Sequence, residues 1–195
     1  MARVPQITAM IRLKNIEKSY DGHRVLSGFS ADIGDGETVI LFGDSGAGKT
    51  TLLRLMLGLE KPDSGSVDVT GMTFSAVFQE DRLCAHADAV ENVTVVTKTL
   101  SAAAAEDELK RLLPEDRHHM PVSELSGGEK RRVAIVRAMC HAADAYLLDE
   151  PFTGLDEDMQ QKAMEYILEK TAGKTLIITA HEEWQYDKGR KIAVG

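Results

Sequence analysis

The chain has 195 residues, which suffice for one sizeable hydrophobic core with a small inserted subdomain. Its hydrophobic and charged fractions, 43% and 28%, are ordinary for a globular protein, and the net charge of −8 argues against a nucleic-acid surface, which is usually basic. The two cysteines, Cys84 and Cys140, are too few for a disulfide framework, so we expect reduced thiols in a cytosolic protein. We find no signal peptide and no apolar run of about 18 residues, so work at a membrane would require a partner that spans it.

Alternating apolar and polar residues predict strands in the first part of the chain. The alternation covers residues 11–20 and 25–33, as in half-buried strands, and residues 37–42 add an apolar run. Farther along, residues 101–113 favour a helix that Ser101 caps and that ends at the sequence Pro-Glu-Asp.

Two short apolar runs predict buried parallel strands in the last third of the chain. Residues 145–150 and 174–181 are bounded by charged residues and glycine, which is typical of strands covered on both faces. Between them, Asp156 can cap a helix that extends to about Thr171. Strands that alternate with helices indicate an α/β fold, and the helical stretch from about 80 to 142 interrupts this alternation as an inserted subdomain.

A glycine-rich loop follows the apolar run that ends near residue 42. It satisfies the pattern G-x-x-x-x-G-K-[ST] and precedes a helical run, which is the context this motif requires. Backbone N–H groups of such a loop and the positive helix end point toward phosphates, while Lys49 pairs with the β- and γ-phosphates and Thr50 ligates Mg²⁺. The alternative is a glycine-rich turn with a solvated lysine, which the agreement of strand, loop and helix disfavours. The predicted nucleotide-binding residues of this segment are Gly43, Asp44, Ser45, Gly46, Ala47, Gly48, Lys49, Thr50 and Thr51.

Two carboxylates follow the apolar run at residues 145–148. Asp149 would lie at the carboxyl edge of the sheet, where α/β proteins bind ligands, and could hold Mg²⁺. Glu150 would face the γ-phosphate and could polarise the attacking water. The alternative is a plain acidic start of a loop, which the preceding phosphate-binding motif disfavours.

A second phosphate-binding device is predicted by the sequence LSGGEKRRVAIVRAM at residues 125–139. Ser126 and two glycines open a helix there, so exposed N–H groups and the helix N-terminus form an anion site. A single phosphate-binding loop can hold a nucleotide without a second phosphate site in the same chain. The simplest explanation for the second site is therefore a dimer, in which the second site of each chain closes over the nucleotide of the other.

Two polar runs are expected to be solvated. Lys130-Arg131-Arg132 is interpreted as an exposed helix face, with or without ion pairs. His118-His119 is interpreted as a turn after Pro114, because no matching cluster of metal ligands accompanies the histidines.

With these motifs in this order, the chain resembles the ATP-binding subunits of ABC transporters over nearly its whole length. The resemblance implies that residues 43–50 are the Walker A motif and that residues 146–150 are the Walker B motif with the catalytic glutamate. Residues 125–129 match the LSGGQ signature, with Glu129 in place of glutamine. The resemblance further implies that four of these residues contact the nucleotide of a partner chain: Ser126, Gly127, Gly128 and Glu129.

The resemblance also implies roles for four single residues. Tyr20 matches the aromatic residue that stacks on adenine, although a lone tyrosine is more often a surface or core residue. Gln79 matches the Q-loop glutamine, which contacts Mg²⁺ and water and links to the membrane subunit. Asp156 lies in a segment that resembles the D-loop. His181 matches the switch histidine that contacts the γ-phosphate, the alternative being a histidine with a local hydrogen bond only.

The fold that the resemblance implies is α/β, with a RecA-like P-loop NTPase core and a mostly parallel sheet. An N-terminal antiparallel β subdomain and an inserted α-helical subdomain complete a single domain over residues 1–195. We place the core at about 1–79 and 143–195 and the helical subdomain at about 80–142. Residues 190–195 are expected to form the last core strand, after which family members usually continue.

The function that the resemblance implies is ATP hydrolysis, with ATP and Mg²⁺, that drives small-solute transport through separate transmembrane subunits. A second copy bound head to tail, permease subunits and a substrate-binding protein are the implied partners, without nucleic acid. The chain would be cytoplasmic, on the inner face of the membrane.

The sequence VFQEDRL followed by ENV resembles importers for nitrate, sulfonate and related anions. The alternatives are a non-transport ABC ATPase of translation or DNA repair and a regulatory module that holds ATP without hydrolysing it.

Overall fold

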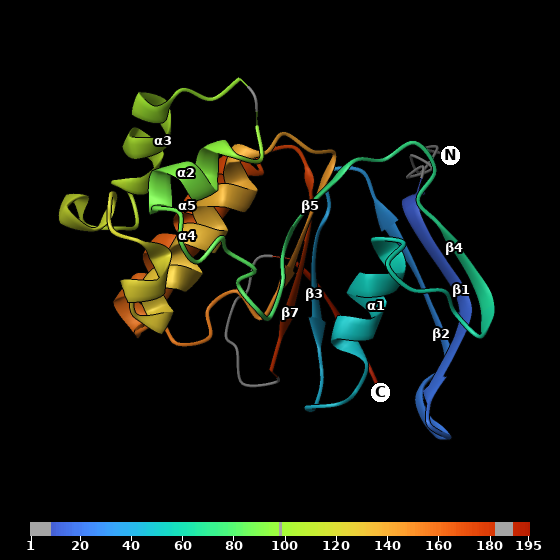
Figure 1. Ribbon diagram of the computed structural model, residues 1–195. Coiled ribbons are helices and arrows are strands. Elements are labelled where there is room, and N and C mark those ends of the chain that lie inside the picture. The colour runs from blue at the N-terminus through green and yellow to red at the C-terminus, as the bar shows by residue number, and fades with distance from the viewer. Residues whose placement is uncertain (1–8, 98, 182–188) are drawn as a thin grey trace, which may run out of the picture.

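Two β-sheets flank helix α1 (Lys49–Met56), and the remaining helices pack beyond the second sheet (Figure 1). The computed structural model describes residues 9–97, 99–181 and 189–195. Residues 1–8 and 182–188 of the expected core therefore lie outside the described residues, and the division into core and helical subdomain stays a prediction.

The first sheet is antiparallel and has the order β2 (His23–Gly34), β1 (Ala9–Tyr20), β4 (Ser64–Asp68). The two expected strands are confirmed, whereas β4 was not predicted because SGSVD has no apolar alternation. Pairing of β1 with β4 requires glycine at position 65. A Cβ atom there would lie 2.3 Å from the carbonyl oxygen of Asn15, and the φ angle is +88°.

The second sheet is parallel and has the order β5 (Phe74–Val77), β6 (Ala145–Asp149), β7 (Thr175–Ala180), β3 (Thr38–Phe42), β8 (Arg190–Ala193). Every residue of β6 and β7 is buried, as their continuous apolar runs predicted. β8 is the expected last core strand, whereas the short β5 was not predicted.

Apolar side chains cover both faces of the parallel sheet. Leu147 and Ile177 pack toward α1 and the antiparallel sheet, while Leu148 and Ile178 pack toward the helices on the opposite face. The alternation of neighbouring residues between the two cores follows from the period of two in a strand. The sheet is therefore held from both sides, and its strand ends keep a defined position.

The helices beyond the sheet are α2 (Ala89–Thr94), α3 (Ala102–Leu109), α4 (Gly127–Cys140) and α5 (Glu157–Lys170), with short 3₁₀ helices at Glu115–Arg117 and Val122–Glu124. Ser101 caps α3 and Asp156 caps α5, as expected. Helix α3 ends at Leu109, earlier than the predicted end at residue 113. Within the described ranges, every helix falls short of the length and hydrophobicity that a bilayer span requires.

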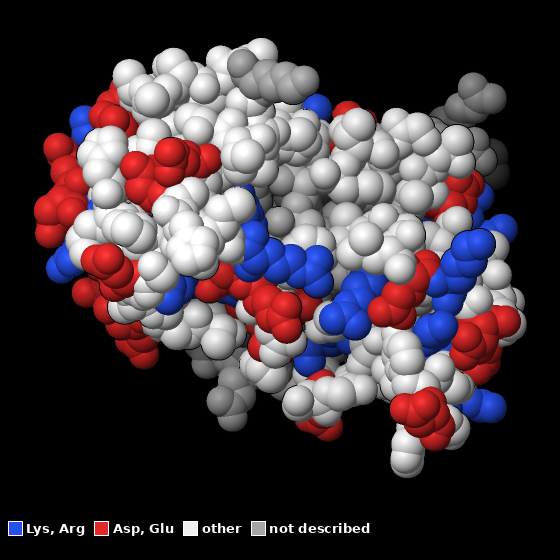
Figure 2. Space-filling view, in the orientation of Figure 1, with Lys and Arg blue, Asp and Glu red and all other residues white. Residues whose placement is uncertain are grey.

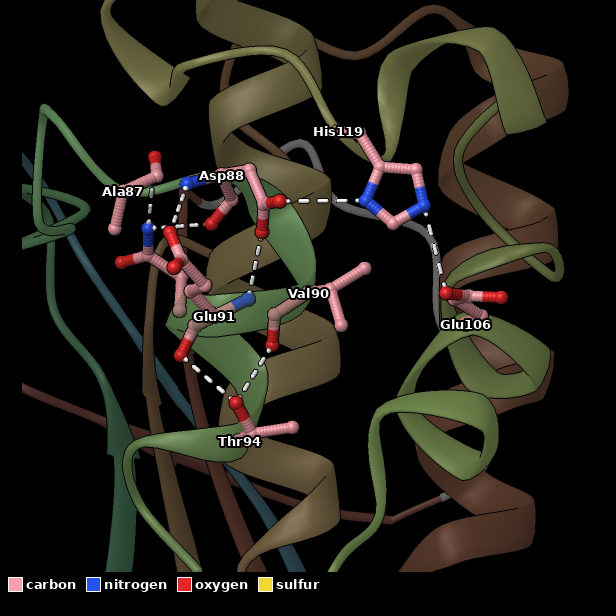
Figure 3. A network of polar contacts seen from close by, with 8 residues as sticks. Ala87, Asp88, Val90, Glu91, Thr94, Glu106 and His119 are labelled. Carbon is pink, nitrogen blue, oxygen red and sulfur yellow. Dashed lines mark hydrogen bonds and ion pairs between the residues drawn. The ribbon is translucent and has the colours of Figure 1, made fainter.

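Acidic and basic side chains lie close together on the face seen in Figure 2. Near the N-terminus of α2, a network of polar contacts links α2 to α3 through His119 (Figure 3). Asp88 caps α2 in a capping box with Glu91, and its second carboxylate oxygen lies 3.3 Å from Nδ1 of His119. Nε2 of the same imidazole lies 3.4 Å from Glu106 on α3, so His119 bridges two carboxylates.

The two neighbouring histidines differ in environment. His119 is exposed, but His118 is buried, with Nε2 lying 3.1 Å from the carbonyl oxygen of Leu113. The expectation of a solvated turn is therefore wrong for His118, because the turn packs its ring into the helical core. Among the described residues, no group of three or more His, Cys, Asp or Glu side chains could hold a metal ion.

The substitution Gly65→Ala should destabilise the protein far more than Gly71→Ala. Both glycines have positive φ angles, but a Cβ atom at position 71 meets nothing within 4 Å. We expect a loss of about 1 kcal/mol for Gly71→Ala from the backbone conformation alone. Because β1 and β4 must separate, we expect at least about 3 kcal/mol for Gly65→Ala. Denaturant unfolding measures both, and equal losses would contradict the close approach.

Candidate functional site

The loop between β3 and α1 passes close to the end of β8. A Cβ atom at Gly43 would lie 2.3 Å from the carbonyl oxygen of Val194, so only glycine fits there. Lys49 is buried, and its ammonium donates hydrogen bonds to the carbonyl oxygens of Gly43 and Asp44 at 2.6 and 2.9 Å. The lysine is thus held by neutral loop groups that a phosphate can replace.

Helix α1 differs from the other α-helices that the structure describes. No side chain caps its N-terminus, and its first turn carries no acidic residue. In contrast, α2, α3, α4 and α5 each have a side chain that accepts a hydrogen bond from a first-turn N–H group. The first N–H groups and the positive end of the α1 dipole are therefore available to an anion.

A pocket of about 280 Å³ lies beside this loop and collects residues from five chain segments. It is lined by Tyr20, Val25, Ser45, Gly46, Gly48, Lys49, Thr50, Thr51, Gln79 and Glu150. Of the predicted loop residues, Gly43, Asp44 and Ala47 belong to the same turn but do not line the pocket. Val25 was missed because a valine in an alternating strand carries no signal that separates a pocket position from a core position.

Tyr20 lies at the end of β1 and is partly exposed at the pocket. Its hydroxyl donates a short hydrogen bond to the carboxylate of Glu60, and Nζ of Lys18 lies 5.3 Å from its ring centroid. Burial and the bond to Glu60 raise the pKa of the Tyr20 hydroxyl, so the phenol stays neutral. The side chain offers an aromatic ring that is anchored at its polar end.

The carboxyl ends of β6 and β7 bring four polar side chains together. Oγ1 of Thr179 donates to Oδ1 of buried Asp149 at 2.7 Å and accepts the N–H of Glu150 at 2.9 Å. Nε2 of His181 lies 3.4 Å from Oε1 of Glu150. Glu150 lines both the pocket above and a second hollow of about 330 Å³ that His181 also lines, whereas Asp149 lines neither.

The predicted signature residues form the N-terminus of α4. Ser126 and Glu129 make a reciprocal capping box, in which the Glu129 carboxylate accepts the N–H of Ser126 at 2.8 Å. This hydrogen bond, together with nearby Arg117, lowers the pKa of Glu129. A Cβ atom at Gly128 would lie 3.0 Å from the carbonyl oxygen of Gly154, so the signature packs against the D-loop segment of its own chain.

The predicted signature and D-loop residues do not line the pocket beside the β3–α1 loop in this chain. Asp156 uses its carboxylate to accept the N–H of Met159 at 2.9 Å, which caps α5. Contacts of Ser126, Gly127, Gly128, Glu129 and Asp156 with a nucleotide therefore stay predictions.

The expectation of a solvated face at Lys130-Arg131-Arg132 is wrong for Arg131, whose exposed fraction is 3%. Its guanidinium donates to backbone oxygens of the segments that carry Gln79 and Glu150. Arg131 lies four residues before buried Ile135, on the same face of α4, and this spacing was the signal that could have shown its burial.

The chain belongs to the ABC transporter family, because residues 26–153 match the family of that description. It is 36% identical to the L-cystine import ATP-binding protein TcyN of Bacillus subtilis (89% of this chain, 76% of the relative). It is 34% identical to the spermidine/putrescine import ATP-binding protein PotA of Mesoplasma florum, of which it spans about half the length (89% of this chain, 55% of the relative). The Nod factor export ATP-binding protein I of Cupriavidus metallidurans is 33% identical (97% and 72%).

A solved structure supports the same assignment. The dimeric ATP-binding cassette MJ0796, in a post-hydrolysis state bound to ADP and Pi, superimposes with a TM-score of 0.79. The sequence identity is 28%, and the alignment covers 88% of each chain. The α/β fold expected for a P-loop ATPase of this family is confirmed.

The substitution Glu129→Gln should remove a pH-dependent part of the stability. Because folding lowers the pKa of Glu129, its charge stabilises the native state above the unfolded pKa of about 4.3 and ceases to do so as the pH falls through the folded pKa. At pH 7 we expect the variant to lose about 0.5 kcal/mol from weaker charge–helix attraction. Denaturant unfolding from pH 7 to below pH 4 should show this difference shrink, and a difference independent of pH would contradict the argument.

Proposed function

We propose that this chain binds ATP with Mg²⁺ and hydrolyses it to ADP and phosphate. The observation that carries the proposal is the pocket in which Lys49, Thr50, Gln79 and Glu150 meet, although they are far apart in the sequence. Glu150 is in addition close to His181, as catalysis by this pair would require. The relatives described above as import ATP-binding proteins support the assignment.

The residues present fit both a polyphosphate and a divalent cation. The uncapped end of α1 and the buried ammonium of Lys49 provide donors for phosphate oxygens. For Mg²⁺, Thr50 and Gln79 line the pocket, and Asp149 contributes a buried carboxylate whose Oδ1 accepts a hydrogen bond from the neutral hydroxyl of Thr179. When bound, the cation would neutralise charge on the β- and γ-phosphate oxygens.

The chemical step needs little from the protein beyond positioning and charge. We propose that Glu150 orients a water molecule and accepts its proton as the water oxygen attacks the γ-phosphorus. The bond between the γ-phosphorus and the bridging oxygen breaks, and ADP leaves. His181, which lies beside Glu150, would donate a hydrogen bond to the γ-phosphate.

We propose that two copies of the chain act head to tail. Ser126, Gly127 and Gly128 do not line the pocket of their own chain, so the signature would close over the nucleotide of the partner. The dimeric state of the solved relative supports the pairing of two chains. Glu129 and Asp156 would then lie at the same interface.

We propose transport as the work that hydrolysis drives, with import as its direction. Two of the relatives named above are import proteins, and one is an export protein. Separate permease subunits would hold the chain at the inner face of the membrane, and a substrate-binding protein would deliver a small solute.

The transported solute would belong to one of three classes. Residues 77–83 suggest nitrate and sulfonate anions, and the names of the relatives suggest amino acids or polyamines. The net charge of −8 and the mixed charges in Figure 2 support the absence of a nucleic-acid partner.

The substitution Glu150→Gln should trap an ATP-bound dimer. The amide keeps the shape of the carboxylate but cannot accept the proton, so hydrolysis that would reopen the dimer is lost. Light scattering should show a monomer that doubles in mass only with ATP and Mg²⁺, beside a wild type that releases phosphate. Glu165→Gln, an equal change at an exposed position of α5, serves as the control. A variant that binds ATP yet stays monomeric would contradict the self-paired dimer.

The substitution Tyr20→Ala should weaken ATP binding about tenfold, because stacking on a base contributes about 1–3 kcal/mol. Tyr20→Phe keeps the ring and loses the hydrogen bonds of the hydroxyl with Glu60 and Thr51, so we expect its Kd to stay within about twofold of the wild type. Titration with a fluorescent ATP analogue measures both. If the two variants lose affinity equally, the ring does not stack on adenine.

A further inference from the structure

Arg131 is the most extensively bonded buried cation near the site among the described residues. It lies on α4 with an exposed fraction of 3%, and its guanidinium makes six hydrogen bonds of 2.6 to 3.3 Å. The acceptors fall into two groups: the carbonyl oxygens of Phe78 and Gln79 with the carboxylate of Asp81, and the carbonyl oxygens of Asp149, Glu150 and Pro151.

The two groups follow neighbouring parallel strands. The first comes after β5 and contains Gln79, and the second comes after β6 and contains Glu150. One planar guanidinium spans them, with Nη1 on the first segment and Nη2 on the second. A lysine has one ammonium centre and cannot reproduce this fork.

Glu150 has a backbone conformation that requires support. Its φ angle of +46° lies in the left-handed region, which is unfavourable for residues other than glycine. Such conformations persist when the surroundings hold them, and they cluster at functional sites. Here Nη2 of Arg131 binds the carbonyl oxygens on both sides of the Cα atom, at 2.7 Å for Asp149 and 2.6 Å for Glu150. The N–H of Glu150 is bound by Thr179.

We infer that Arg131 is a positioning residue for hydrolysis, which sets the backbone of Glu150 relative to the segment of Gln79. The inference rests on the proposed ATPase function. Arg131 does not line the nucleotide pocket, so its effect on the reaction passes through Glu150. The segment after β5 has an independent anchor, because Arg137 donates to the carbonyl oxygens of Asp81 and Arg82 at 2.8 Å. Loss of Arg131 should therefore misplace Glu150 without releasing the whole segment.

The test compares Arg131→Gln and Arg131→Lys with Lys130→Gln, which removes the same charge one residue away on α4. Lys130 is partly buried and donates a hydrogen bond to the carbonyl oxygen of Ser123 at 3.3 Å, away from the segments of Gln79 and Glu150. We expect kcat for ATP hydrolysis by the full chain to fall at least about tenfold in Arg131→Gln, while the Kd for an ATP analogue stays within about twofold. Arg131→Lys should keep most of the defect, and Lys130→Gln should behave as the wild type. Thermal unfolding establishes that each variant is folded.

A double-mutant cycle with Glu150→Gln tests the route of the effect. If Arg131 acts through Glu150, adding Arg131→Gln to Glu150→Gln should lower the residual rate no further. Additive losses, an unchanged kcat in Arg131→Gln, or an equal loss of ATP affinity would overturn the inference. Failure of both Arg131 variants to fold would also overturn it, because it would assign Arg131 to the fold instead. A folded wild type without hydrolysis would overturn the proposed function itself, so the two failures are distinguishable.

Discussion

The parallel pairing of β3, β6 and β7 is the constraint on which the site depends. In this register Asp149 lies opposite Thr179 and Phe42 lies opposite Ala180, so three strands end at one edge of the sheet. The phosphate-binding loop leaves from the first of these ends, the paired carboxylates from the second and His181 from the third. Two apolar cores pack against the two faces of the sheet, and this burial fixes the positions of the side chains at this edge.

In the part of the chain that the structure describes, three charged side chains are buried around this edge, and each is paired in a different way. Lys49 is held by loop carbonyl oxygens, Asp149 by a hydroxyl and Arg131 by backbone oxygens and a carboxylate. Buried charges are costly unless they are hydrogen-bonded, so these networks restrict the site to few conformations. The partners of Lys49 are neutral carbonyl oxygens, so an incoming anion could take their place and neutralise the ammonium.

The N-termini of α1 and α4 differ in whether a side chain caps their first N–H groups. The end of α1 has no side-chain cap and lies at the pocket, whereas the end of α4 carries its own capping box of Ser126 and Glu129. The close packing of Gly128 against Gly154 keeps the signature in contact with the D-loop segment of its own chain. Under the proposed function, the end of α1 would hold the nucleotide of its own chain, and the end of α4 would face the nucleotide of a second chain.

The sequence by itself determined the features whose cause is local. Glycines at positive φ and a following helix define the phosphate loop, Ser101 and Asp156 cap the helices that follow them, and continuous apolar runs mark β6 and β7 as buried on both faces. The burial of His118 and Arg131 and the position of Val25 at the pocket were decided only by tertiary structure. The role of a polar side chain depends on which distant acceptors the fold brings to it, and the acceptors of Arg131 come from segments about 20 and 50 residues away, between which no sequence spacing specifies a contact.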